Sequence, residues 1–325
     1  MRVFRDLTNL PAFKNSVITI GTFDGVHKGH QKLIERINFL AKQNEGESII
    51  VTFHPHPRIV INPQDKSLRL LNTIEEKITL LEKCGVDNLV IVPFSRDFSE
   101  QTAEDYVEHF LVKNFHPKNI VIGYDHKFGK DRGGDYHLLE NRKDQFGYLM
   151  EEITKETLDD IGISSTKIRN ALQGGEVALA NELLGHNYTL TGTVVRGLQN
   201  GRKLGFPTAN VQVNDEYKLI PKTGIYVVRV TDAAEPAAVH NGMLSIGYNP
   251  TFEGKEQTIE ANILDFDKDI YGNTLTLEFI HYIRDEKKFD SVDALIAEIK
   301  NDERVTRKIF SSKFSPPTPS STHLL

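Results

Sequence analysis

The order of strand-like and helix-like segments constrains the fold of this chain more than any other feature. In the first 185 residues, apolar runs rich in β-branched residues alternate with amphipathic helical patterns. Strands that alternate with helices predict a parallel sheet covered by helices on both faces. The expected strands are residues 17–20, 49–53, 89–94 and 120–123, and the expected helices are residues 28–43, 73–84, 102–115 and 135–146.

The pattern changes near residue 185, after two short helical stretches at residues 166–173 and 176–184. Six strand candidates joined by turns then predict an antiparallel barrel or sandwich. They are residues 188–196, 209–213, 225–230, 243–248, 258–266 and 274–283, followed by an amphipathic helix over 291–310. We therefore expect an α/β domain over 1–185, a β domain over 186–312, and a disordered tail over 313–325, which is rich in Pro, Ser and Thr.

Composition excludes several classes of protein. A net charge of −6 argues against a general nucleic-acid binder, which needs a dominant basic face. The single cysteine, Cys84, allows no intramolecular disulfide. No apolar run approaches the roughly 20 residues of a membrane span. We expect a cytoplasmic protein that binds small molecules but neither nucleic acid nor membrane, as a monomer or weak homo-oligomer.

The segment GTFDGVHKGH, residues 21–30, joins the first expected strand to the first expected helix. Parallel sheets bind ligands beyond the carboxyl ends of their strands, and a helix N-terminus presents unpaired N–H groups to anions. His27 and His30 share one face of the first helical turn and can donate hydrogen bonds to phosphate oxygens. The segment therefore predicts a nucleoside triphosphate site. Its other candidate binding residues are Gly21, Phe23, Asp24, Gly25 and Gly29.

Two other interpretations of the histidine pair stay open. Two histidines three residues apart can bind a metal, although the nearby residues do not complete a zinc set. They can also be exposed side chains without a function. The segment is neither a P-loop, since no Gly-Lys-Ser/Thr follows, nor a GxGxxG motif.

Three further segments of the first half carry polar residues where strands end or helices begin. In TFHPHP, residues 52–57, two prolines stiffen the turn that presents His56. Asp125 follows a strand and is placed to bind a ribose hydroxyl or an adenine amine. Ser164, Ser165 and Thr166 begin a helix, with Arg169 one turn on, which suits phosphate binding. Plain helix capping and ordinary turn chemistry remain the alternatives for these residues.

The second half opens with TGTVVRGLQNGRKLGFPTANV, residues 191–211. A glycine-rich, basic loop between two strands suits a close approach of the backbone to phosphates. Thr208 and Asn210 lie two apart on a strand, so they face the same side, and their oxygens suit Mg²⁺. A glycine-rich hairpin loop without a ligand is the alternative.

These segments resemble the bacterial bifunctional riboflavin kinase/FAD synthetase family. GTFDGVHKGH is similar to the HxGH motif of nucleotidyltransferases, and TFHPHP, GYDHKFGKDRGGD and ISSTKIR match the FMN adenylyltransferase module in order. GRKLGFPTAN resembles the riboflavin kinase motif, with later matches at residues 221–226, 245–252, 259–272 and 279–291. The resemblance implies a Rossmann-like nucleotidyltransferase domain followed by a six-stranded barrel with a C-terminal helix.

The implied chemistry has two steps. The barrel phosphorylates riboflavin to FMN with ATP and Mg²⁺, with Glu260 as the base that activates the ribityl 5′-hydroxyl. The α/β domain then transfers the adenylyl group of ATP to FMN, which yields FAD and pyrophosphate. That step needs no general base because the attacking phosphate is already an anion. Positioning and charge stabilisation by His27, His30, Ser165 and Arg169 would supply the catalysis.

The remaining site residues are assigned by the same resemblance and the loop patterns. The nucleotide and phosphate sites are expected to include Asp125, Ser164, Ser165, Thr166, Gly197, Gly201, Arg202, Lys203 and Gly205. Flavin contacts are assigned to His56, Phe128, Asp135 and Arg284, and Mg²⁺ to Thr208 and Asn210.

The sequence departs from the family pattern at four positions. His126 and Lys127 stand where an aromatic residue and an arginine are usual, Asn262 replaces a frequent histidine, and Ser245 replaces a common asparagine. Two rival functions stay open. One is an HxGH nucleotidyltransferase for another acceptor, with a barrel that only binds, and the other is a flavin carrier without catalysis.

Overall fold

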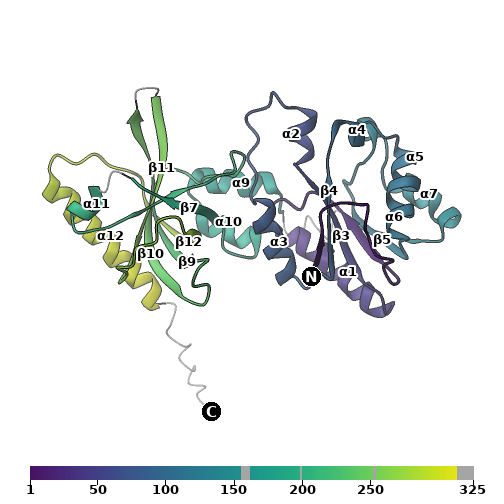
Figure 1. Ribbon diagram of the computed structural model, residues 1–325, viewed down its shortest axis with the longest axis horizontal. Helices are drawn as coiled ribbons and strands as arrows, with labels where there is room; N and C mark the ends of the chain where they lie inside the picture. Colours follow the sequence, from purple (N-terminus) through teal and green to yellow (C-terminus); the bar gives the residue numbers. More distant parts are fainter. Residues whose placement is uncertain (155–161, 198–199, 252–253, 313–325) are drawn as a thin grey trace, which may run out of the picture. The chain divides into compact units, whose positions relative to one another are not determined.

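The chain forms two compact units in the computed structural model, which describes residues 1–154, 162–197, 200–251 and 254–312 (Figure 1). The first unit comprises Met1–Arg169, Leu183–Gly185 and Tyr217–Leu219. Asn170–Glu182, His186–Glu216 and Ile220–Leu325 belong to the second unit. The expected domain boundary at residues 185/186 stays a prediction, and the tail expected to be disordered, 313–325, lies outside the described residues.

The first unit is built on a six-stranded parallel sheet. Its strands are β1 (Arg2–Phe4), β2 (Val17–Ile20), β3 (Ser48–His54), β4 (Asn88–Pro93), β5 (Asn119–Gly123) and β6 (Leu149–Ile153). Their order is β1-β4-β3-β2-β5-β6, and every adjacent pair is parallel. The predicted parallel sheet is thereby confirmed. The two edge strands, β1 and β6, were not predicted from the sequence.

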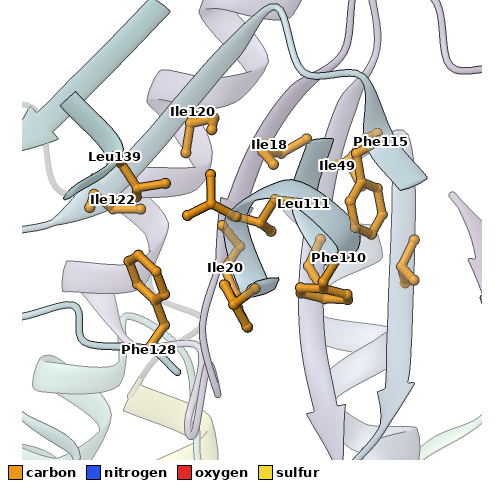
Figure 2. Close-up of a cluster of buried hydrophobic side chains, with 14 of the residues drawn as sticks. Ile18, Ile20, Ile49, Phe110, Leu111, Phe115, Ile120, Ile122, Phe128 and Leu139 are labelled. Carbon is orange, nitrogen blue, oxygen red and sulfur yellow. The ribbon is translucent and has the colours of Figure 1, made fainter. Parts of the chain in front are cut away.

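Helices cover both faces of this sheet, because successive strand residues point to opposite sides. Ile18 belongs to a cluster with Phe110, Leu111 and Leu139, on the face covered by η1 and α7 (Figure 2). Val17 belongs to the opposite cluster, which α1 and α3 cover. The helices of this part of the chain are α1 (Lys28–Gln43), α2 (Pro57–Ile61), α3 (Ile74–Lys83), α4 (Arg96–Ser99), α5 (Ala103–Asp105), the π-helical η1 (Tyr106–Val112), α6 (Lys113–Phe115), the 3₁₀ turn η2 (Lys130–Arg132), α7 (Tyr136–Phe146), α9 (Ser165–Gly174) and α10 (Val177–Leu184).

The strand order places a topological switch point at β2. The chain runs from β2 to β3 and β4 on one side and then returns to add β5 on the other side. Open α/β sheets bind ligands outside the carboxyl ends of the strands at such a point. The segment 21–30 leaves the carboxyl end of β2, so the fold positions the histidine turn at the expected place.

The second unit contains a closed antiparallel barrel, so the barrel is confirmed and the sandwich is excluded. Its strands are β7 (Thr189–Val195), β8 (Ala209–Gln212), β9 (Gly224–Asp232), β10 (Val239–Thr251), β11 (Gly254–Ile263) and β12 (Thr274–Arg284), in the order β10-β11-β8-β7-β12-β9. A short helix, α11 (Asn200–Lys203), follows β7, and α12 (Val292–Ser312) ends the described chain. Phe310 of α12 packs on Val227 and Ile280 of the barrel.

Candidate active sites

The two histidines of the segment 21–30 stack on each other at the start of α1. Their ring centroids lie 3.7 Å apart with an interplanar angle of 12°. His27 is the N-cap of α1, and its Nδ1 accepts a hydrogen bond from the backbone N–H of His30 over 3.3 Å. The predicted shared face is therefore present, and one imidazole also does the work of a capping residue.

Burial keeps His30 uncharged. Removal from water lowers the pKa of His30 well below its usual value of 6.5, and the nearby charges of His27 and Lys77 lower it further. Its Nδ1 is buried and has no hydrogen-bond partner among the described residues. A neutral ring with an unused nitrogen is suited to hydrogen bonding with a bound ligand rather than to carrying a permanent positive charge.

Asp24 connects the histidine turn to the start of α9. Its Oδ2 accepts from Arg169 Nη1 over 2.6 Å, and its backbone carbonyl accepts from Ser165 Oγ over 2.9 Å. The ion pair is largely shielded, since the Asp24 and Arg169 side chains are 8% and 20% exposed. Two sequence-predicted segments, residues 21–30 and 163–169, are thus brought together at one place.

The serines at the start of α9 have different roles. Ser164 Oγ accepts from the backbone N–H of Lys167, which is the pattern of an N-cap. Ser165 instead donates to the carbonyl of Asp24, and Thr166 Oγ1 accepts from Arg169 Nη2 over 3.4 Å. Helix capping therefore accounts for Ser164 but not for Ser165, whose hydroxyl ties the helix to the histidine turn.

Gly25 is required by packing as well as by backbone conformation. Its φ is +90°, and a Cβ atom at this position would lie 2.7 Å from Leu71 Cδ1. Its N–H donates to Asn72 Oδ1 over 2.5 Å, and Leu71 N donates to Asp24 Oδ1 over 2.8 Å. The turn that carries the histidines is thus fixed by residues 71–72.

The four other predicted residues of the first unit are less closely gathered. His56 is the N-cap of α2, and burial together with the charges of Lys77, Arg58 and Arg169 lowers its pKa to about 4. Asp125 is exposed in the turn after β5. Phe128 is 6% exposed in the core and stacks on Tyr106, and Asp135 caps α7 and pairs with Lys127. Their roles toward a ligand stay predictions.

In the second unit, Thr208, which directly precedes strand β8, contacts Glu260 of the neighbouring strand β11. Thr208 Oγ1 donates to Glu260 Oε2 over 3.0 Å. Glu260 also lies directly opposite Asn210 in the β8–β11 register. The predicted metal ligands, on β8 and directly before it, and the predicted base on β11 therefore lie at one position of the barrel.

The glycines before β8 make room for this group. A Cβ on Gly197 would lie 2.2 Å from Asn210 Nδ2, and one on Gly201 would lie 2.3 Å from the carbonyl oxygen of Phe206. Gly205 has φ +85° and open space around it. Gly197 and Gly201 are thus explained by packing against the β8 segment, without a ligand.

A cavity of about 300 Å³ lies beside Thr208. Its lining includes Arg202, Ala261, Phe266 and Tyr271, so the predicted phosphate-binding Arg202 reaches it. The side chain of Lys203 lies outside what the structure describes. Arg284 does not line this cavity, and it forms ion pairs with Glu298 and Asp302 of α12.

Comparison with known proteins covers both units. A family model for FAD synthetase matches residues 10–167, and one for riboflavin kinase matches residues 184–310. A bifunctional riboflavin kinase/FMN adenylyltransferase of Listeria monocytogenes is 40% identical, over 91% of this chain and 93% of its own. The protein of that name from Haemophilus influenzae is 36% identical, over 96% and 100%. The chain belongs to this bifunctional family.

A solved structure resembles the chain over nearly its whole length. It is a Streptococcus pneumoniae protein titled a macrolide-efflux protein, with a TM-score of 0.82, 34% identity, and coverage of 94% of this chain and 98% of that one. None of the helices in the described part of the chain combines the length and apolar character needed to cross a membrane. The described residues also contain no group of three or more His, Cys, Asp or Glu side chains placed to hold a metal.

Sequence reasoning missed Lys77, a buried lysine beside the histidine turn. Its Nζ donates to the carbonyl of Thr22 over 2.6 Å, and burial lowers its pKa to about 8, against the opposing effect of Asp24. A signal was present in the sequence. Ile74, Lys77 and Leu81 occupy positions i, i+3 and i+7 of α3 and are all buried, so a lysine interrupts an apolar stripe.

Proposed function

We propose that the protein phosphorylates riboflavin to FMN in its barrel unit and transfers an adenylyl group to FMN in its α/β unit, with ATP as co-substrate of both reactions. The observation that carries the proposal is that each unit has its own group of polar residues. The barrel unit has the Thr208–Glu260 hydrogen bond, and the α/β unit has the Asp24–Arg169 ion pair and the stacked histidines. Membership of the bifunctional family supports the same assignment.

In the kinase step, Glu260 accepts the proton of the riboflavin 5′-hydroxyl as its oxygen attacks the γ-phosphorus of ATP, and ADP leaves. A carboxylate suits this role because a neutral alcohol must lose its proton to become a good nucleophile. Thr208 orients the carboxylate through its hydrogen bond.

Thr208 and Asn210 fit a Mg²⁺ ion. A hydroxyl that donates its hydrogen to Glu260 keeps its oxygen lone pairs for a cation, and the Asn210 amide oxygen is a second hard ligand. When bound, Mg²⁺ would neutralise charge on the ATP phosphates.

In the adenylyl transfer step, a phosphate oxygen of FMN attacks the α-phosphorus of ATP, and pyrophosphate leaves. The attacking group is an anion, so the protein supplies position and charge. Arg169 contributes the cation, and neutral His30 contributes a hydrogen bond from its unused nitrogen. Because both reactions consume ATP, we infer a cytoplasmic location; a monomer or weak homo-oligomer stays the predicted state.

The test is a product assay with riboflavin, ATP and Mg²⁺, in which riboflavin, FMN and FAD are separated by chromatography and detected by fluorescence. FMN followed by FAD is the expected result. FMN alone would remove the adenylyltransferase half of the proposal and direct attention to His126 and Lys127. If neither riboflavin nor supplied FMN is converted, the proposed function is wrong, and the flavin-carrier hypothesis replaces it.

A further inference from the structure

Residues Tyr217–Leu219 lie in the sequence between barrel strands β8 and β9, yet they belong to the α/β unit. They form a short parallel bridge with the loop before α3, where Leu70 pairs with Lys218. Leu70 N donates to the Tyr217 carbonyl over 2.6 Å, and Leu219 N donates to the Leu70 carbonyl over 2.8 Å. The α/β unit thus includes a segment far outside the residues that the FAD synthetase model matches.

Lys218 is the centre of this attachment. Its side chain is 0% exposed, and its Nζ donates to Glu76 Oε2 over 2.5 Å and to the Leu71 carbonyl over 2.7 Å. A buried ammonium is costly unless it is paired and hydrogen-bonded, so these partners fix its position closely. Glu76 is held in turn, because its Oε2 accepts from the backbone N–H of Thr73 at the start of α3.

The loop that Lys218 holds is the one that holds the histidine turn. Leu71 accepts from Lys218 with its carbonyl and donates to Asp24 Oδ1 with its N–H over 2.8 Å. The next residue, Asn72, accepts from the N–H of Gly25 over 2.5 Å. Asp24 then pairs with Arg169. A continuous series of buried bonds therefore connects Lys218 to the Asp24–Arg169 pair.

We propose that Lys218 is a positioning residue for adenylyl transfer, acting through Leu71 and Asn72 to hold Asp24, Gly25 and Arg169 in place. The inference rests on the proposed function of the α/β unit. Because the Lys218 side chain is fully buried, it acts through these residues and not on a substrate directly. Loss of Lys218 should lower the rate of adenylyl transfer, because a small displacement of a catalytic group lowers the rate even when the substituted residue is remote.

The experiment uses the full-length protein with Lys218→Met, Glu76→Gln and the double variant. Lys218→Met removes the donor to Leu71 and leaves the Glu76 carboxylate buried without this cation. The double variant removes both charges, so its thermal stability should be higher than that of Lys218→Met alone. Its Leu71 carbonyl still lacks the hydrogen bond that Lys218 donates in the wild type. Lys143→Met is the matched control, because Lys143 and Glu140 form a half-buried ion pair in the same unit that takes no part in this series of bonds.

We expect Lys218→Met to lower kcat for FAD formation from supplied FMN by about tenfold or more, with KM for FMN and ATP changed much less. Riboflavin phosphorylation by the same preparation should be unchanged. The double variant should regain stability but not kcat. Recovery of kcat together with stability would overturn the proposal, because Lys218 would then act on folding alone.

Hydrogen–deuterium exchange separates this proposal from the proposed function. In Lys218→Met, peptides that cover residues 21–27 and 70–72 should exchange faster than in the wild type and in Lys143→Met. Unchanged exchange there would refute the positioning role. If the wild-type protein makes no FAD, the adenylyltransferase assignment fails, and the exchange result still decides whether Lys218 holds the turn.

Discussion

Thr208, the residue directly before strand β8, donates a hydrogen bond to Glu260 of the neighbouring strand β11, with an Oγ1–Oε2 distance of 3.0 Å. The two residues are 52 positions apart in the sequence, and the pairing of β8 with β11 in the barrel brings them together. Their contact orients the Glu260 carboxylate, and Thr208 also lines a cavity of about 300 Å³. If Glu260 is the base of the kinase reaction, as we propose, mutation of this pair should separate that reaction from adenylyl transfer.

Glu260→Gln should lower riboflavin phosphorylation by about 10²- to 10⁴-fold, the usual contribution of a general base. FAD formation from supplied FMN should be unchanged, because the other site lies in the α/β unit. Both rates are measured by chromatography of the products. Glu278→Gln, which alters a half-buried pair with Arg229 in the same barrel, is the control. Undiminished kinase activity would remove Glu260 as the base.

His30→Ala should have the opposite selectivity. It removes a neutral imidazole whose buried Nδ1 has no hydrogen-bond partner among the described residues. We expect FAD formation from FMN to fall by about 10²-fold, as for loss of a preorganised hydrogen-bond donor, with the kinase rate unchanged. His109→Ala is the control, since His109 is 63% exposed. Equal loss of both activities in a folded variant would contradict the two-site assignment.

Asp24→Asn should destabilise the α/β unit because it leaves Arg169 facing a neutral amide. The pair is mostly shielded from water. We expect a loss of about 2 kcal/mol in the free energy of unfolding, between the values typical of exposed and of buried pairs. Denaturant unfolding measures it, with Glu151→Gln as the control, because its pair with Arg36 is more exposed. A loss of stability no larger than that of the control would contradict the claim that shielding from water strengthens the Asp24–Arg169 ion pair.

Acid should destabilise the protein through its buried histidines. Burial lowers the pKa of His126 to about 4 from the ordinary 6.5, despite the opposing charge of Asp125. Between these values the unfolded chain binds a proton that the folded protein does not, so stability falls as pH falls from 6.5 toward 4. His126→Phe should therefore reduce the stability difference between pH 7 and pH 5 by about 1 kcal/mol.

Urea unfolding at the two pH values measures this difference, and the NMR titration of the His126 ring reports its pKa directly. An ordinary pKa for His126, or an identical pH dependence in His126→Phe, would show that the ring is solvated. His137→Phe serves as the control, because His137 is exposed in the first turn of α7.

The central strands could be predicted because burial on both faces demands continuous apolar runs. VITI and NIVIG carry that signal, and both became strands at the centre of the sheet. The edge strands do not need it. RVF is three residues long and partly exposed, and LMEEI contains two glutamates, so neither sequence resembles a buried strand.

Contacts in the candidate sites could be predicted from the sequence where the residues are neighbours along the chain, but not where they are far apart. His27 and His30 are three residues apart on a helix start, so their contact follows from helical geometry. Asp24 and Arg169 are 145 residues apart, and no local pattern connects them. The resemblance placed both segments in one site, but the bond between their side chains required the tertiary structure.

The return of the chain to the α/β unit at Tyr217–Leu219 limits how the two halves of the protein can be exchanged between relatives by recombination. If the units joined at a single peptide bond, recombination between relatives could exchange one enzyme for another at one crossover. Here a crossover near residue 185 would also replace Lys218, while Glu76 and Leu71 would stay behind. We therefore expect functional chimaeras to be those whose donor barrel carries a lysine at this position. The sequences of the two halves are then expected to change together in evolution.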